Sequence, residues 1–141
     1  THALSQRFPK AKQVLRIAAQ QVAKVIKIDT STVFVLMTHN YQYDLEVLKS
    51  LEGTLTPYIG VLGPKARLHR MFNELIQAET PLGESQKLKI HGPMGLDIGA
   101  ETAEEIALSV VSEIKAVLAA RSGSPLKFLP DKIHNDIPII S

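Results

Sequence analysis

The chain contains no cysteine and no tryptophan, and aromatic residues make up 5% of its 141 residues. Without cysteine there is no disulfide, no thiolate zinc site, no iron–sulfur cluster and no cysteine nucleophile. So few aromatic residues argue against a surface on which nucleic-acid bases stack. The net charge of +2 is too close to balance to indicate nucleic acid by itself. We therefore expect no nucleic-acid partner.

Long hydrophobic runs are also missing. The longest obvious one extends from Val33 to Met37, whereas a transmembrane helix needs about 20 apolar residues. The first seven residues lack the charged-then-apolar pattern of a signal peptide. We expect a cytoplasmic protein with no membrane partner. Its size suits one domain, which we place at residues 1–123, followed by a tail or arm at 124–141.

Short apolar runs rich in β-branched residues predict buried strands at 33–37 and 58–62, and a third strand at 88–91. Apolar residues at helical spacing predict the helices between and after them. The first of these helices spans 45–51, with Asp44 as its cap and Gly53 as its closing residue. The second begins at Pro64 and carries an apolar stripe made of Leu68, Met71, Phe72, Leu75 and Ile76. The third is capped by Thr102 and Glu105, and its expected buried face consists of Ala103, Ile106, Ala107, Val110, Val111, Ile114, Val117 and Leu118. The remaining expectations are a short edge strand at 12–17, a helix over 18–26 and a loop at 80–85.

Strands that alternate with helices predict an α/β fold with a parallel sheet and right-handed crossovers. In such sheets ligands bind beyond the carboxyl ends of the strands. Three loops are expected at that edge: Thr38-His39-Asn40, Gly63-Pro64-Lys65, and the glycine-rich segment from Gly92 to Gly99.

The helix start after Gly63 carries Lys65 and Arg67, with Arg70 about one turn further on. Free N–H groups and the helix dipole attract an anion at such a position, so a phosphate site is one interpretation. The other is a solvated helix face opposite the apolar stripe.

The glycine-rich loop has the spacing G-x-x-G-x-x-x-G, with Gly92, Gly95 and Gly99. It is neither the dinucleotide fingerprint nor a phosphate loop of the G-x-x-x-x-G-K-[ST] type. Its glycines would let a ligand approach the backbone closely. Alternatively they serve a turn that needs positive φ angles, with Asp97 bonded to amides of the loop.

His39 follows the first buried strand, where it can serve as an acid or base, a hydrogen-bond donor or a metal ligand. His91 follows the third strand in the same way, while His69 and His134 lie on an expected exposed helix face and in the tail. Two histidines without a carboxylate pair are weak evidence for metal, so we predict no metal site. Neither G-x-S-x-G nor H-E-x-x-H occurs, and we assign no catalytic residue.

Three segments, in this order, carry a family resemblance: Val-Leu-Met-Thr-His-Asn at 35–40, Tyr-Ile-Gly-Val-Leu-Gly at 58–63, and HGPMGLDIGAETAEEIA at 91–107. Together with Asp44-Leu45 they resemble the C-terminal Rossmann-like domain of the XdhC/CoxI family, from about Arg7 to about Gly123. The GPMGLDIGAETAEEIA stretch is the most specific part.

The resemblance implies a three-layer Rossmann-like parallel sheet with flanking helices. The family's first β-α-β portion, with its G-A-G-H-V-G turn, is not found in the chain, nor is its cysteine-bearing N-terminal domain. Pro64 stands where relatives often have serine. A central strand left without its neighbour would expose an edge, so we expect a homo-oligomer.

The resemblance further implies an accessory protein for molybdenum hydroxylases of the xanthine dehydrogenase type. Such a protein binds the molybdenum cofactor (molybdopterin) transiently and aids its maturation and insertion. The implied partners are the hydroxylase and a sulfurtransferase, and the chain is expected to bind cofactor rather than act as an enzyme. The cofactor-binding residues we predict are Thr38, His39, Asn40, Gly63, Lys65, Arg67, Gly92, Gly95, Asp97 and Gly99. Two alternatives stay open: an enzyme that binds NAD or FAD, and a structural oligomerisation module that uses the segment 126–141.

Overall fold

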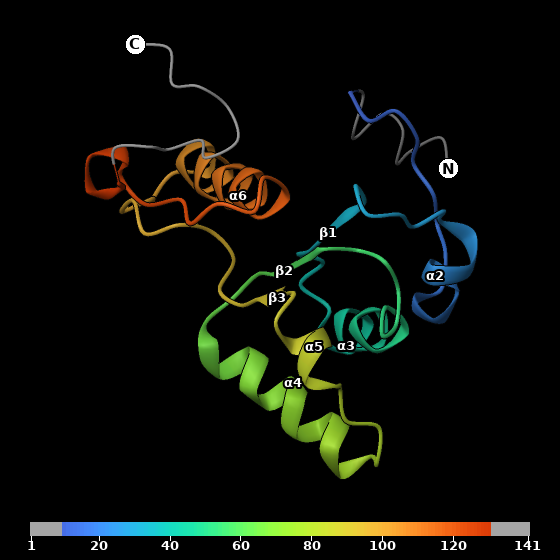
Figure 1. The fold of residues 1–141 in the computed structure, drawn as a ribbon. Coiled ribbons are helices and arrows are strands. Elements are labelled where there is room, and N and C mark those ends of the chain that lie inside the picture. Colours follow the sequence, from blue (N-terminus) through green and yellow to red (C-terminus); the bar gives the residue numbers. More distant parts are fainter. Residues whose placement is uncertain (1–9, 131–141) are drawn as a thin grey trace. The chain divides into compact units, whose positions relative to one another are not determined.

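The structure is a computed structural model that describes residues 10–130. The chain divides into two compact units, residues 1–93 and residues 94–141, which are described separately (Figure 1). Within residues 10–130 no helix is both long and apolar enough to cross a membrane.

The first unit is built on a sheet of three parallel strands in the order β1-β2-β3. The strands are β1 (Val33–Leu36), β2 (Tyr58–Val61) and β3 (Ile90–His91). Val33 of β1 lies opposite Tyr58, and Gly60 of β2 lies opposite His91. The predicted α/β class is therefore confirmed, as a partial Rossmann-like sheet with flanking helices.

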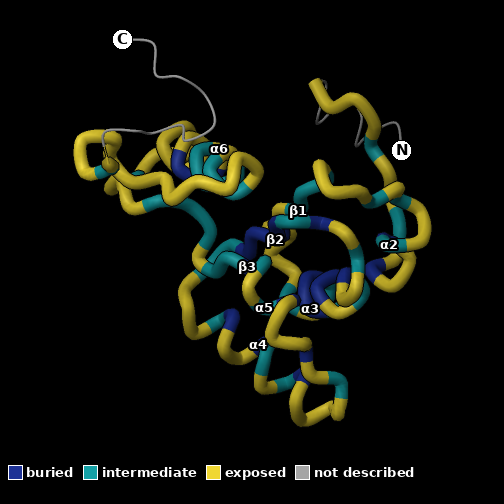
Figure 2. Tube along the Cα trace, in the orientation of Figure 1, coloured by how far each residue is buried: buried dark blue, intermediate teal, exposed yellow. Residues whose placement is uncertain are grey.

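Helices connect these strands and form the core with them. They are η1 (Ala19–Gln21), α2 (Val22–Val25), α3 (Tyr41–Ser50), α4 (Lys65–Gln77) and α5 (Glu84–Lys87). Both α3 and α4 lie on the same side of the strands in Figure 1, and the buried stretches of Figure 2 meet there. Leu48, Ile59 and Met71 are fully inaccessible members of this core.

The N-terminal part of this unit differs from the prediction. Residues 12–17 form no strand, and the helix expected over 18–26 is one 3₁₀ turn followed by the four residues of α2. Most of 12–17 is exposed, and the Ile17 carbonyl accepts a hydrogen bond from the Tyr43 hydroxyl at 3.0 Å instead of pairing in a ladder. Ala19 and Val22 are nevertheless buried against the core, as the helical spacing indicated.

The strand predicted to be buried on both faces is β1, and that expectation is wrong. Leu36 is buried, but Val35 is 37% exposed. Among the described strands β1 pairs with β2 alone, so its other side is unpaired within residues 10–130. A continuous apolar sequence does not distinguish a strand buried on both faces from a strand that is buried on one face and partly exposed on the other.

Helix α3 begins earlier than predicted. Its N-cap is Asn40, whose side-chain oxygen accepts a hydrogen bond from the Tyr43 N–H at 3.0 Å. Asp44, the predicted cap, lies inside the first turn and is fully buried. The helix ends at the C-cap Leu51, and Gly53, the predicted closing residue, lies two positions further on in the following turn, with φ +79°.

Small shifts also occur around α4 and β3. Pro64 is the N-cap of α4 rather than its first residue. On the apolar stripe Leu68, Met71 and Leu75 are buried, whereas Ile76 is 52% exposed. The predicted third strand is reduced to its last two residues, because the N–H groups of Leu88 and Lys89 bond back to carbonyls of Glu84 and Gln86 at the end of α5. Helix α5 itself lies partly inside the predicted loop.

The second unit contains α6 (Ala103–Leu118) and η2 (Leu126–Phe128). The predicted capping box is present: Glu105 N–H donates to Thr102 Oγ1 at 3.1 Å, and Thr102 N–H donates to Glu105 Oε1 at 3.0 Å. The predicted buried face is mostly wrong, since within α6 the buried residues are Ser109 and Val110 and Val111 is 62% exposed.

Candidate functional site

A pocket of about 610 Å³ opens where β1 and β2 end, at the edge at which ligands bind in parallel α/β sheets. Two of the three predicted loops, those that follow β1 and β2, meet there. Its lining residues are Met37, His39, Tyr41, Asp44, Leu62, Gly63, Ala66, Arg67 and Arg70.

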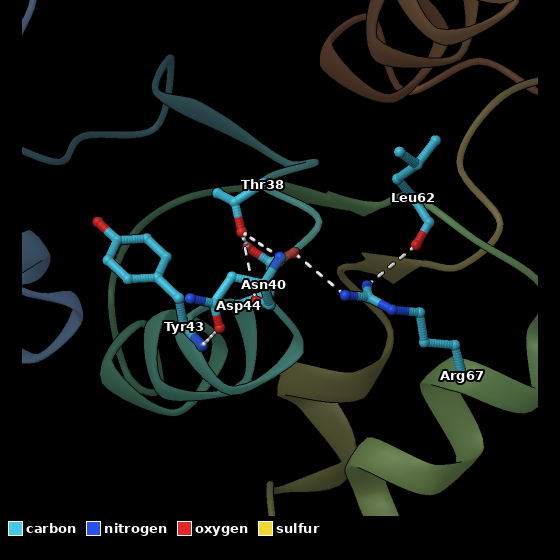
Figure 3. Close-up of polar contacts among 6 residues, drawn as sticks. All are labelled: Thr38, Asn40, Tyr43, Asp44, Leu62 and Arg67. Atoms are coloured by element: carbon cyan, nitrogen blue, oxygen red, sulfur yellow. Dashed lines mark hydrogen bonds and ion pairs between the residues drawn. The ribbon is translucent and has the colours of Figure 1, made fainter.

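The loop after β1 is held by its own polar side chains. Thr38 Oγ1 accepts a hydrogen bond from the Asn40 N–H at 3.1 Å and lies 2.8 Å from Asp44 Oδ1 (Figure 3). His39, between Thr38 and Asn40 in the sequence, is exposed and adopts φ +62°, a left-handed conformation that is uncommon for residues other than glycine. Thr38 and Asn40 therefore shape the loop, and His39 is the residue that lines the pocket.

An ion pair joins the helices on either side of the pocket. Arg67 Nη2 on α4 lies 3.4 Å from Asp44 Oδ2 on α3, and Arg67 Nη1 donates to the Leu62 carbonyl at 3.1 Å (Figure 3). The Asp44 side chain has no exposed surface and that of Arg67 is 21% exposed. Arg67 thus connects α3 to the end of β2.

Gly63 is required by this arrangement. Its φ of +111° disfavours any side chain, and an added Cβ would lie 2.9 Å from Arg67 Cδ. The glycine lets the chain turn from β2 into α4 directly against the arginine side chain.

Tyr41 lines the pocket and was missed by sequence reasoning, whereas Arg70 was noted beside the helix start but not included among the predicted binding residues. The guanidinium carbons of Arg67 and Arg70 lie 5.5 Å and 4.3 Å from the centre of the Tyr41 ring. Both distances are in the range of cation–π contacts. The spacing of the two arginines on one helix pointed to Arg70, but no pattern in the sequence indicates Tyr41.

The Tyr41 hydroxyl is buried beside the Glu74 carboxylate, and within the part of the chain that the structure describes the two do not reach good hydrogen-bond geometry. Burial, followed by the nearby Glu74 carboxylate, raises the pKa of this hydroxyl above its ordinary value. Tyr41 is therefore protonated at neutral pH and has a hydrogen to donate.

The other predicted residues are distributed differently. Lys65 is exposed and does not line the pocket. Gly92 packs against Leu68, since an added Cβ would lie 2.8 Å from its Cδ2. Asp97 and Gly99 line a separate hollow of about 310 Å³ in the second unit, where Asp97 is exposed.

Gly95 has a structural role in the second unit. Its N–H donates to Glu113 Oε1 at 2.9 Å, and at φ +113° an added Cβ would collide with Ser109 Oγ. This matches the alternative in which the glycines serve a turn with positive φ.

Among residues 10–130 no three histidine, aspartate or glutamate side chains are grouped so that they could hold a metal ion. His91 stacks on the ring of Tyr58 with 4.6 Å between centroids. The pocket instead combines two cations, one buried carboxylate, an aromatic ring and the apolar side chains of Met37 and Leu62. This combination suits a ligand that is anionic at one end and flat or apolar at the other.

Comparisons with known proteins agree with this architecture. The model of the XdhC Rossmann domain matches residues 1–114. The solved structure of a xanthine dehydrogenase from Bacillus halodurans superposes with a TM-score of 0.66 at 28% sequence identity, covering 88% of this chain and 35% of that one.

Two curated relatives are similar in sequence. A probable xanthine dehydrogenase subunit of Bacillus subtilis is 35% identical over 107 residues, which are 76% of this chain and 30% of the relative. The molybdenum cofactor insertion chaperone PaoD of Escherichia coli is 31% identical over 93 residues, 64% of this chain and 28% of the relative. The chain thus spans less than a third of these proteins. With the family model matched over most of its length, the chain belongs to the XdhC family, as a Rossmann domain of that family.

Proposed function

We propose that this chain is part of an accessory protein for molybdenum hydroxylases, and that the pocket at the ends of β1 and β2 binds the molybdenum cofactor during its maturation and insertion. Two relatives, one named as a molybdenum cofactor insertion chaperone and one as a probable xanthine dehydrogenase subunit, support the accessory role. The client would be a xanthine dehydrogenase or a related hydroxylase, with a sulfurtransferase as a further partner.

The observation that carries the assignment of the pocket is its pair of arginines beside an uncapped helix start. Helix α4 begins after Gly63 and Pro64 with no side-chain cap, and Ala66 of its first turn lines the pocket. Free N–H groups and nearby guanidinium groups suit the phosphate of the cofactor or of an attached nucleotide. Tyr41, Met37 and Leu62 offer surface for the flat pterin.

The residues predicted from the sequence fit into this proposal in two ways. His39 and Gly63 line the pocket directly, and Thr38 and Asn40 hold the loop that carries His39. Arg67 holds the pocket through Asp44, and Lys65 is exposed outside its lining. The predicted roles of Gly92, Gly95, Asp97 and Gly99 in cofactor binding remain predictions.

An anaerobic titration of the 141-residue chain with the molybdenum cofactor tests it, with NAD and FAD as controls. We expect saturable binding of the cofactor and none of the two dinucleotides. Binding of NAD or FAD with no binding of the molybdenum cofactor would instead support the nucleotide-dependent enzyme and reject this proposal.

A further inference from the structure

The two arginines of the pocket differ in whether their terminal nitrogens already contact protein atoms. Arg67 directs both terminal nitrogens at protein atoms, Asp44 Oδ2 and the Leu62 carbonyl. Turning Arg67 toward a ligand would leave the fully buried Asp44 carboxylate without its cation, which is strongly unfavourable. Arg67 is therefore committed to holding the pocket together.

Arg70 has its terminal nitrogens available. Its Nε lies 3.2 Å from Glu74 Oε1, and its two Nη groups make no hydrogen bond or ion pair with any residue between 10 and 130. This pair is exposed, with 67% of the Arg70 side chain and 37% of that of Glu74 accessible. Exposed pairs one helical turn apart are weak, so a ligand with two negative charges can displace the glutamate.

Tyr41 supplies the neutral donor beside this cation. Its ring lies under the Arg70 guanidinium, 4.3 Å from ring centre to Cζ, and it lines the same pocket. Its hydroxyl is a buried polar atom that forms no well-aligned hydrogen bond among the described residues, and its neighbour there is the Glu74 carboxylate that also pairs with Arg70. Buried polar groups in native proteins nearly always have a partner, so a ligand atom that displaces Glu74 can pair with this hydroxyl as well as with Arg70.

We propose that Arg70 and Tyr41 contact the anionic group of the ligand, a phosphate ester, and that Glu74 competes with this group for Arg70. Arg67 is a positioning residue that acts through Asp44, and Lys65 makes no direct contact. The inference rests on the proposed function for the identity of the ligand and on the geometry of the pocket for the site of the anion.

The test uses the full chain and two probes, inorganic pyrophosphate and the molybdenum cofactor. Arg70→Gln is compared with Lys65→Gln, because both remove one positive charge from an exposed side chain of α4. We expect Arg70→Gln to weaken binding of both probes by about tenfold or more, and Lys65→Gln by less than about twofold.

Two further variants test the roles of the neighbours. Glu74→Gln removes the competitor and its repulsion, so it strengthens binding of both probes several-fold. Tyr41→Phe removes the buried hydroxyl, so it weakens binding without lowering the thermal unfolding midpoint. That midpoint, measured for every variant without ligand, distinguishes loss of a contact from loss of the fold.

The binding results distinguish the anion site at Arg70 and Tyr41 from the proposed binding of the molybdenum cofactor. Equal effects of Arg70→Gln and Lys65→Gln, or no strengthening by Glu74→Gln, would overturn the inference, and so would failure of the wild-type chain to bind either probe. Cofactor binding that is unaffected by Arg70→Gln and Tyr41→Phe would reject this inference and retain the proposed function. Pyrophosphate binding with the expected pattern, without cofactor binding, would support the anion site and reject the cofactor as its ligand.

Discussion

Arg67 on α4 reaches the fully buried carboxylate of Asp44 on α3, with 3.4 Å between Nη2 and Oδ2. The two residues are 23 positions apart in the sequence. The same arginine holds the carbonyl of Leu62 at the end of β2. The pair therefore fixes the loop after β1 relative to the loop after β2, and with them the shape of the pocket.

The first prediction concerns the stability that this pair provides. Arg67→Met leaves the Asp44 carboxylate buried without its cation, and we expect a loss of about 3 kcal/mol in the free energy of unfolding. Arg70→Met is the matched control, because its partner Glu74 is exposed, and we expect a loss below about 1 kcal/mol. Chemical denaturation of both variants measures the difference.

A double-mutant cycle then isolates the interaction. Asp44→Asn combined with Arg67→Met should be less destabilised than the sum of the single variants, because neither charge is left alone. Purely additive losses would show that Arg67 acts through packing and not through its charge.

The second prediction concerns two glycines of the second unit. Gly95→Ala has to accommodate φ +113° and a collision with Ser109, so we expect a loss of about 2–3 kcal/mol in stability. Gly99 has φ +67° and nothing within 4 Å of an added Cβ, so Gly99→Ala should lose about 1 kcal/mol. Hydrogen exchange of the α6 amides reports both losses. Similar protection of α6 in the two variants would contradict the structural role of Gly95.

The third prediction is a pH dependence at the start of α6. Hydrogen bonds from the backbone of Thr102 and then of Glu101 lower the pKa of Glu105 below its ordinary value of 4.5. Because the folded-state pKa is the lower one, the stabilisation is complete above pH 4.5 and is lost as the pH falls through the folded-state pKa.

This dependence is measured from the amide resonances of Glu101 and Thr102, both of which donate to Glu105 Oε1. In the wild-type chain they should shift with an apparent pKa below 4.5. Glu105→Gln keeps an acceptor but does not titrate, so its resonances should remain flat over that range. A wild-type midpoint at or above 4.5 would refute the ionised capping box.

The sequence allowed the general plan to be predicted because the relevant signals are local. The capping box of Thr102 and Glu105 depends on residues three apart, and the stripe of Leu68, Met71 and Leu75 depends on one helix. The position of the pocket followed from topology, since parallel strands place the residues after β1 and β2 at one edge.

The parts that were not predicted depend on contacts between distant segments. The burial of Asp44 is set by Thr38 and Arg67, so a residue whose sequence context predicts a helix cap is instead an internal ion-pair partner. The exposure of Val35 depends on which strands flank β1, and the apolar sequence of β1 does not indicate which strands these are. The role of Tyr41 arises only when α4 places two arginines over its ring.

The central claim is that the pocket beside α4 holds the molybdenum cofactor. The most direct test is an anaerobic titration of the isotope-labelled chain with the cofactor, followed by the amide resonances of each residue. We expect saturable shifts concentrated at His39, Gly63 and Ala66, which line the pocket. Saturable binding that leaves these three amides unchanged would contradict the claim.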